Sequence, residues 1–201
     1  MMEILYKVHN NLYVNLTNKC PCSCVFCLRQ NKDKVGESES LWLDHEPSFE
    51  EVKEAFERQD MLQYDEVVFC GFGEPTEALP MLKQVAKFVK DTYHMPIRVN
   101  TNGLGNLIWD RDITPEFEGL VDTISISLNT PNAEKYHEIV RSKFGDKSFD
   151  AMLTFAKNVK KYVPNVVLST VSTTISKEEE EKCAKICEEI GVTYRIRPYE
   201  E

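Results

Sequence analysis

The 201-residue sequence has no apolar run that approaches the roughly 18 residues a membrane-spanning helix needs. Its first residues, MMEILYKVHNN, also lack the basic region and apolar core of a secretory signal peptide. We therefore expect a cytoplasmic protein with no membrane partner. Low-complexity tracts and breaks in composition are missing as well, so we expect one domain over residues 1–201.

Basic residues are scarce relative to acidic ones. The chain has 24 Lys and Arg against 33 Asp and Glu, which gives a formal net charge of −9. Binding to a nucleic-acid backbone needs concentrated positive charge, so this balance argues against a nucleic-acid partner. Four basic residues do gather around one loop, namely Lys19, Arg29, Lys32 and Lys34.

That loop is rich in cysteine. Four of the seven cysteines lie within the eight residues CPCSCVFC, from Cys20 to Cys27. Structural disulfides are rare in the cytoplasm, where clustered thiols more often bind metal or do redox work. Four cysteines can close a zinc site or a four-thiolate iron–sulfur cluster, whereas three leave one iron of a cluster open. The residues alone leave these alternatives open.

Short apolar runs alternate with helical patterns along the chain. A hairpin is expected from ILYKV and LYVNL, joined by residues 9–11. Five further strands are predicted at residues 66–70, 97–100, 123–128, 165–171 and 192–197. Helices are predicted at residues 48–56 and 77–91, after Thr114, from Thr130, at residues 148–162 and at residues 176–191. This order predicts a parallel α/β sheet, as a partial (β/α)6 TIM-like barrel with an N-terminal hairpin or as a doubly wound sheet.

Polar residues gather where the predicted strands end. These ends read TNKCPCSCVFC, GFGEPT, NTNG, SLNT, STVST and RPY. In (β/α) barrels the chemistry lies at the carboxyl ends of the strands, so the pattern favours the barrel and predicts a site there.

The spacing C-x3-C-x2-C of Cys20, Cys24 and Cys27, with Phe26 before the last cysteine, resembles the radical S-adenosylmethionine (SAM) superfamily. GFGEP at residues 71–75 and TNG at residues 101–103 resemble two further motifs of that family. Within it, the chain is most similar to the small radical SAM proteins associated with TatD-type nucleases.

The resemblance implies an enzyme in which Cys20, Cys24 and Cys27 hold a [4Fe–4S] cluster whose fourth iron binds SAM. In the family, reductive cleavage of SAM yields a 5′-deoxyadenosyl radical that takes hydrogen from a substrate, here unidentified. Cys22 is then not a cluster ligand. The alternative is a non-catalytic module that uses the four cysteines for zinc or for an electron-transfer cluster.

The resemblance also assigns SAM contacts. Gly71 and Gly73 allow close approach to the methionine end, and Glu74 offers an acceptor for its ammonium group. Ser127 and Asn129 alternate on one predicted strand and match residues that bind the ribose. The remaining candidates sit at strand or helix ends: Asn102, Arg141, Ser169 and Arg197.

The other cysteines are expected to pack in the core. Cys183 and Cys187 complete an apolar helical stripe with Ile186 and Ile190. Cys70 ends an apolar strand.

Partners follow from the same reasoning. The basic residues around the cysteine loop predict a docking surface for an acidic flavodoxin or ferredoxin as electron donor. Because the sequence stops after the sixth strand, cover for the radical is expected from elsewhere. We expect a macromolecular substrate, a second subunit of a homodimer, or the stretch from Val35 to Glu46, whose LWL offers apolar surface.

Overall fold

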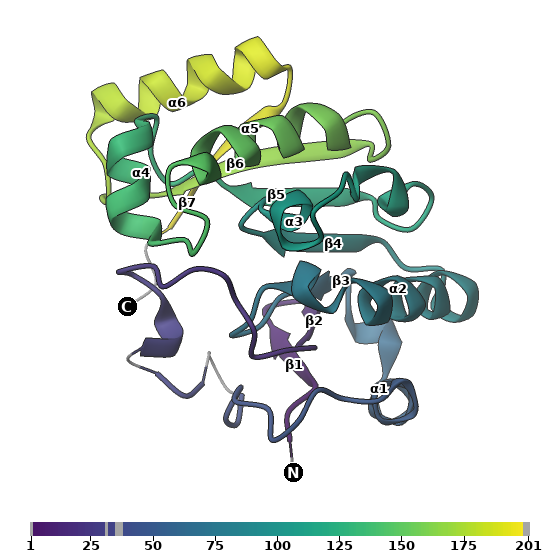
Figure 1. Cartoon of the computed structure of the whole chain (residues 1–201). Coiled ribbons are helices and arrows are strands. Elements are labelled where there is room, and N and C mark those ends of the chain that lie inside the picture. The colour runs from purple at the N-terminus through teal and green to yellow at the C-terminus, as the bar shows by residue number, and fades with distance from the viewer. Residues whose placement is uncertain (1, 31, 35–37, 199–201) are drawn as a thin grey trace. The chain divides into compact units, whose positions relative to one another are not determined.

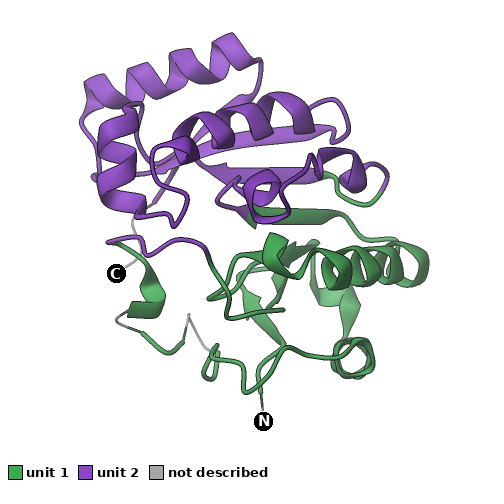
Figure 2. Cartoon of the chain, viewed as in Figure 1, with its two compact units in different colours: residues 1–20, 26–100, 120–122 green, residues 21–25, 101–119, 123–201 purple. Residues whose placement is uncertain are grey.

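The computed structural model describes residues 2–30, 32–34 and 38–198, which fall into two compact units (Figure 2). Unit 1 comprises Met1–Cys20, Phe26–Asn100 and Leu120–Asp122, and unit 2 comprises Pro21–Val25, Thr101–Gly119 and Thr123–Glu201. Within the described ranges, no helix is both long and apolar enough to cross a membrane.

Unit 1 holds four neighbouring strands. The first two form the predicted antiparallel hairpin, and the others follow in parallel. These strands are β1 (Leu5–Val8), β2 (Asn11–Val14), β3 (Glu66–Phe69) and β4 (Ile97–Thr101). Its helices are α1 (Phe49–Glu57) and α2 (Leu79–Tyr93), with 3-10 turns η1 (Leu28–Gln30), η2 (Met61–Gln63) and η3 (Pro75–Ala78). Figure 1 shows α1 and α2 on the same side of these strands.

Unit 2 holds three parallel strands in chain order. They are β5 (Thr123–Ser127), β6 (Asn165–Val171) and β7 (Thr193–Arg197). Its helices are α3 (Gly105–Ile108), α4 (Ala133–Val140), α5 (Lys147–Val159) and α6 (Lys177–Ile190), with the 3-10 turn η4 (Thr114–Phe117). A mostly parallel α/β arrangement with an N-terminal hairpin is therefore confirmed.

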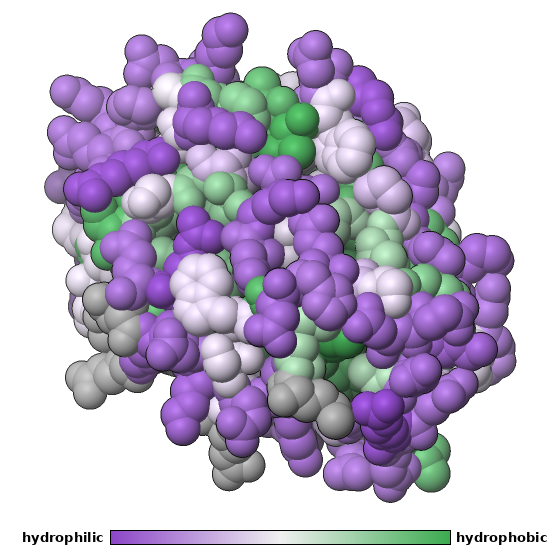
Figure 3. Space-filling view, turned by 60° about the horizontal axis from the view of Figure 1, so that its bottom comes forward, coloured by the Kyte–Doolittle hydropathy of each residue, from purple (hydrophilic) through white to green (hydrophobic). Residues whose placement is uncertain are grey.

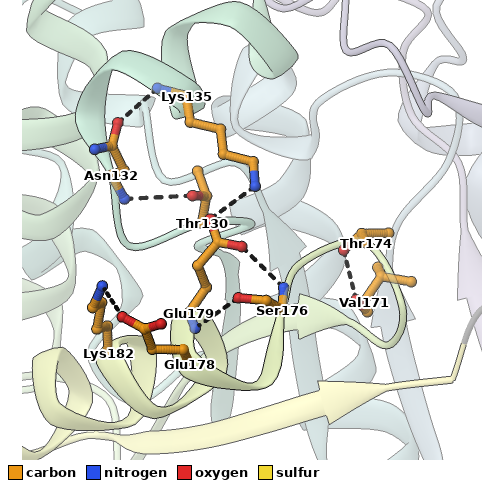
Figure 4. Close-up of polar contacts among 9 residues, drawn as sticks. All are labelled: Thr130, Asn132, Lys135, Val171, Thr174, Ser176, Glu178, Glu179 and Lys182. Atoms are coloured by element: carbon orange, nitrogen blue, oxygen red, sulfur yellow. Dashed lines mark hydrogen bonds and ion pairs between the residues drawn. The ribbon is translucent and has the colours of Figure 1, made fainter.

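The helix starts agree with the sequence pattern, with one correction. Ser176 and Glu179 form a capping box at α6, and Lys135 of α4 pairs with the same Glu179 at 2.8 Å (Figure 4). The predicted opening of α4 at Thr130 is wrong, because the side chain of Asn132 caps the helix by accepting from the Lys135 amide. Asn132 directly precedes the first turn, so its Oδ1 reaches that orphan amide.

The two faces of the unit 1 sheet differ in character. One face is apolar and buried, and its residues are Leu12, Val14, Val67, Phe69, Ile97 and Val99. On the other face the Arg98 guanidinium donates to Glu66 Oε1 at 2.7 and 3.0 Å, and to Asn100 Oδ1 at 3.2 Å. Desolvation lowers the pKa of Arg98, but hydrogen bonding and charge attraction to Glu66 and Tyr13 together outweigh it and raise that pKa overall.

The two cysteines of α6 pack as predicted. Cys183 and Cys187 are buried, and so is Ile190 on the same stripe. Burial raises the pKa of Cys183 to about 12 and that of Cys187 to about 11. Both remain neutral thiols at physiological pH and behave as small apolar side chains.

We predict that Arg98→Met lowers the free energy of unfolding by about 3 kcal/mol, because it leaves the Glu66 carboxylate half-buried without its cation. The double variant Arg98→Met/Glu66→Gln should recover most of that loss. Urea unfolding at pH 7 measures both. Arg58→Met is the matched control: its pair with Glu54 is exposed on both sides and should contribute under about 0.5 kcal/mol. Equal losses for Arg58 and Arg98 would contradict the prediction.

Candidate functional site

Five residues, Asn15 to Lys19, connect β2 to Cys20 in unit 1; we call them the strip. The motif Gly71–Pro75, the glycine turn, packs directly against this strip. The Glu74 amide donates to the Lys19 carbonyl at 2.8 Å. A Cβ on Gly73 would lie 2.1 Å from the Thr17 carbonyl oxygen, and a Cβ on Gly71 would lie 2.1 Å from Asn15 Oδ1. Gly73 is therefore required by the close approach of the strip backbone, whereas a larger residue at position 71 would have to displace the Asn15 side chain. The predicted approach of these glycines to SAM stays a prediction.

Glu74 is fixed by its own turn. Its side chain caps η3, with Oε1 accepting from the Thr76 amide at 3.1 Å and from the Thr76 hydroxyl at 2.7 Å. The residue is buried, with 4% of its surface exposed. The carboxylate therefore has a set direction beside the strip.

The strip also binds the segment Leu41–Glu46. The Asn15 amide group donates to the Leu41 carbonyl at 2.8 Å. Asn18 bonds the Leu43 backbone in both directions, donating to its carbonyl at 2.8 Å and accepting from its amide at 3.0 Å. These contacts were not predicted, because nothing local to Asn15 or Asn18 indicates a partner more than 20 residues away.

Glu46 makes the last of these attachments. It accepts from the Thr17 hydroxyl at 2.8 Å and pairs with Lys19 at 2.9 Å. The hydrogen bonds from Lys19 and Thr17 hold the pKa of Glu46 below its usual value. The segment is thus joined to the strip at both its ends.

The expectation that LWL presents apolar surface is mostly wrong. Leu41 and Leu43 are buried at 1% and 6% exposure, and only Trp42 is substantially exposed, at 39%. Their backbone carbonyls accept from Asn15 and Asn18, so this segment lies against the strip. The Trp42 ring packs edge-on against Phe72 of the glycine turn, with ring centroids 5.1 Å apart. Val35 lies outside the described residues.

Among the described residues, the other large exposed apolar side chains are Val25 and Phe26, which are adjacent in the cysteine loop, and Leu62 and Ile196. The face drawn in Figure 3 shows hydrophilic side chains around small groups of hydrophobic ones.

The middle of the cysteine loop lies in unit 2 and runs beside the end of α4. The Ser23 amide donates to the Val140 carbonyl at 3.1 Å, and the Val25 amide to the Ile139 carbonyl at 2.9 Å. In return, the Lys143 amide donates to the Pro21 carbonyl at 2.8 Å. These backbone bonds fix the loop without using the cysteine side chains.

Cys22 differs from the three cysteines of the motif. It is buried at 5% exposure, whereas Cys20, Cys24 and Cys27 are each half-buried. The Asn102 amide group donates to Cys22 Sγ at 3.6 Å, and Asn102 Oδ1 accepts from the Leu104 amide at 2.9 Å. Cys22 and Asn102 therefore pack together within unit 2.

The donor set of the loop fits an iron–sulfur cluster. Three half-buried thiols at C-x3-C-x2-C spacing, in a loop held by its backbone, suit three thiolate ligands. Within the described ranges, no three His, Cys, Asp or Glu side chains already lie close enough to hold a metal ion.

Three of the predicted contact residues come together in unit 2. The Leu128 and Asn129 amides donate to the Ser169 carbonyl at 2.9 and 3.2 Å, and Asn129 Nδ2 lies 3.5 Å from the Ser127 carbonyl. The argument from alternation does not hold, because β5 ends at Ser127 and Asn129 has a left-handed φ of 65°. Ser169 is 1% exposed, and its hydroxyl donates to the Ile126 carbonyl.

Two predicted arginines lie elsewhere in unit 2. Arg141 is exposed at the end of α4, where its Nε donates to the Glu138 carbonyl and its carbonyl accepts from Ser23 of the cysteine loop. Arg197 is half-buried at the end of β7, opposite Val171.

The basic residues around the cysteine loop are not one uniform patch. Lys32 and Lys34 are exposed, and Lys19 is exposed but paired with Glu46. Arg29 is half-buried and donates to the Asn18 and Phe72 carbonyls.

Comparison with known proteins decides the family. The sequence matches the model of the Radical SAM superfamily over residues 14–191, most of its length. The chain belongs to the radical SAM superfamily. A search of curated proteins found no match.

Solved structures similar to this radical SAM chain share its fold at low identity. SuiB of Streptococcus suis bound to precursor peptide SuiA is 17% identical with a TM-score of 0.68, over 98% of this chain and 41% of that one. A radical SAM methyltransferase from Sphaerobacter thermophilus is 16% identical with a TM-score of 0.65, over 96% and 57%. Native anSMEcpe with bound AdoMet is 17% identical with a TM-score of 0.65, over 94% and 52%.

The chain therefore spans about two fifths to three fifths of the length of these proteins. Their likeness confirms the partial TIM-like barrel fold, and superfamily membership implies a [4Fe–4S] cluster and SAM.

We predict that Gly73→Ala destabilises the protein by about 3 kcal/mol, because its methyl group would force the turn away from the Thr17 carbonyl. Gly119→Ala is the matched control. Gly119 has a positive φ of 71° but open space around its Cβ position, so only backbone strain of about 1 kcal/mol is expected. Thermal unfolding of both variants measures the difference, and equal losses would refute the close-approach argument.

Proposed function

We propose that this domain is a radical SAM enzyme in which the cysteine loop and the glycine turn together hold the cofactors. The main support for this proposal is the 2.8 Å hydrogen bond from the Glu74 amide to the Lys19 carbonyl. It places the residue before Cys20 directly against the proposed SAM-binding turn. When bound, the cluster and SAM supply the reducing electron and the hydrogen-abstracting chemistry.

Cys20, Cys24 and Cys27 are the proposed cluster ligands. Their partial exposure leaves them accessible to metal, whereas Cys22 is buried against Asn102. Three thiolates leave the fourth iron for SAM, as a catalytic metal keeps an open position. Nothing in the structure favours a four-cysteine zinc or electron-transfer module, because the fourth thiol does not share the surroundings of the others.

SAM contacts are proposed in two groups. In unit 1, Gly71, Gly73 and Glu74 hold the methionine end, with Glu74 accepting from its ammonium group. In unit 2, Ser127 and Asn129 bind the ribose, and the Ser169 carbonyl positions them through the Leu128 and Asn129 amides. Asn102, after β4, Arg141, at the end of α4, and Arg197, at the end of β7, remain candidate SAM contacts.

The substrate is unidentified. We propose that its site is completed by a macromolecular substrate or a homodimer partner, and that flavodoxin or ferredoxin reduces the cluster near the exposed Lys32 and Lys34. A cytoplasmic location and kinship with the small TatD-associated group remain proposals of the same kind.

We predict that anaerobic reconstitution of the wild-type protein gives four irons per chain and that replacing Cys20, Cys24 or Cys27 by Ala abolishes this loading. Cys22→Ala is the matched control and should retain it, because its thiol packs against Asn102. Iron analysis and the visible absorption spectrum measure the outcome. Loss of iron in the Cys22 variant alone would overturn the ligand assignment.

We further predict that the reduced wild-type protein releases 5′-deoxyadenosine and methionine from SAM. Glu74→Gln should keep the η3 cap and the iron but weaken SAM binding roughly tenfold, because it removes a charged acceptor. Chromatography and anaerobic calorimetry with SAM measure these effects. Glu77→Gln, in the same 3-10 turn, is the control. An absence of 5′-deoxyadenosine with a strong reductant would exclude the catalytic proposal.

A further inference from the structure

Arg29 is the one basic residue of the cysteine loop region that turns toward the protein. It is half-buried, whereas Lys32 and Lys34 in the same region are exposed. Its Nη1 donates to the Asn18 carbonyl at 3.2 Å and lies 3.4 Å from the Phe72 carbonyl. The expected role in a docking patch does not account for this orientation.

Arg29 is tied to the last cysteine of the motif by short-range structure. It is the central residue of η1, which directly follows Cys27. The Gln30 amide donates to the Cys27 carbonyl at 3.0 Å, and the Lys32 amide donates to the Leu28 carbonyl at 2.8 Å. The position of the guanidinium therefore depends on where the backbone at Cys27 lies, and the reverse also holds.

The two acceptors belong to the two other parts of the proposed site. Asn18 is in the strip, two residues before Cys20, and its side chain is held by the Leu43 backbone. Phe72 lies between the two glycines of the glycine turn and is buried at 6% exposure under the Trp42 ring. Both carbonyls are thus set by contacts that do not involve Arg29.

We propose that Arg29 is a positioning residue that fixes the exit of the cysteine loop against the strip and the glycine turn. This inference rests on the proposed function. It makes the placement of Cys27 relative to the strip and the SAM-binding turn depend on the Arg29 guanidinium. The chemistry suits arginine, because its planar group directs several N–H donors at fixed angles, whereas a lysine ammonium acts as a point charge on a flexible stem.

The test compares Arg29→Ala, Arg29→Lys and Lys32→Ala with the wild type, all reconstituted anaerobically. Iron per chain is measured first, and SAM affinity is then measured by calorimetry on the unreduced protein. We expect all four proteins to carry the same iron. Both Arg29 variants should bind SAM roughly tenfold more weakly, and Lys32→Ala should match the wild type.

Three results would overturn the proposal. Arg29→Ala with wild-type SAM affinity would show that the contacts do not position the loop exit for SAM binding. Rescue by Arg29→Lys would show that charge, and not the guanidinium geometry, is what matters. Iron loss in Arg29→Ala alone would assign the residue to cluster assembly. By contrast, wild-type protein that takes up no iron or SAM would refute the proposed function itself.

A cofactor-independent measurement tests the inference in that case too. Hydrogen–deuterium exchange of the iron-free proteins should show faster exchange in peptides covering Cys27–Gln30 for both Arg29 variants. Lys32→Ala should leave exchange in these peptides unchanged. Unchanged exchange there in both Arg29 variants would overturn the positioning role whether or not the protein binds SAM.

Discussion

Backbone-to-backbone contact between the glycine turn and the strip is the constraint on which the proposed site depends. Side chains cannot intervene, because a Cβ on Gly73 would overlap the carbonyls of Thr17 and Lys19. The contact is closed by the Glu74 amide and the Lys19 carbonyl, one residue before Cys20. The proposed cluster loop therefore starts from a rigid point beside the proposed SAM turn, and such preorganisation is what a two-cofactor site requires.

The strip also binds the segment Leu41–Glu46. Asn15 and Asn18 bond the backbone of the segment Leu41–Glu46, and Trp42 from that segment packs on Phe72 of the glycine turn. Turn, strip and segment thus form one connected set in unit 1. A change that loosens one contact is expected to affect the others, because residues that share partners are not energetically independent.

Local features of the site were predictable from sequence, and long-range ones were not. The capping boxes at Ser48 and Ser176 follow from spacing alone, and the structure shows both. The buried positions of Cys183 and Cys187 likewise follow from helical periodicity. These predictions succeed because each depends on residues within one turn of helix.

The predictions that failed concern residues whose contacts are distant in sequence. LWL was expected to offer apolar surface in a polar loop, but Leu41 and Leu43 are buried, in a segment that Asn15 and Asn18 bind from over 20 residues away. Arg29 read as a surface charge because its acceptors, Asn18 and Phe72, are also distant in sequence. The Arg98–Glu66 pair was not foreseen for the same reason, since strand register brings the two together.

The central claim is that three thiolates bind the cluster and leave one iron for SAM. Mössbauer spectroscopy of protein reconstituted with iron-57 tests it most directly, by resolving the four irons with and without SAM. The account predicts that adding SAM changes the signal of one iron in four and leaves three unchanged. Mössbauer signals that stay unchanged for all four irons when SAM is added would contradict the account, because every iron would then already carry a protein ligand.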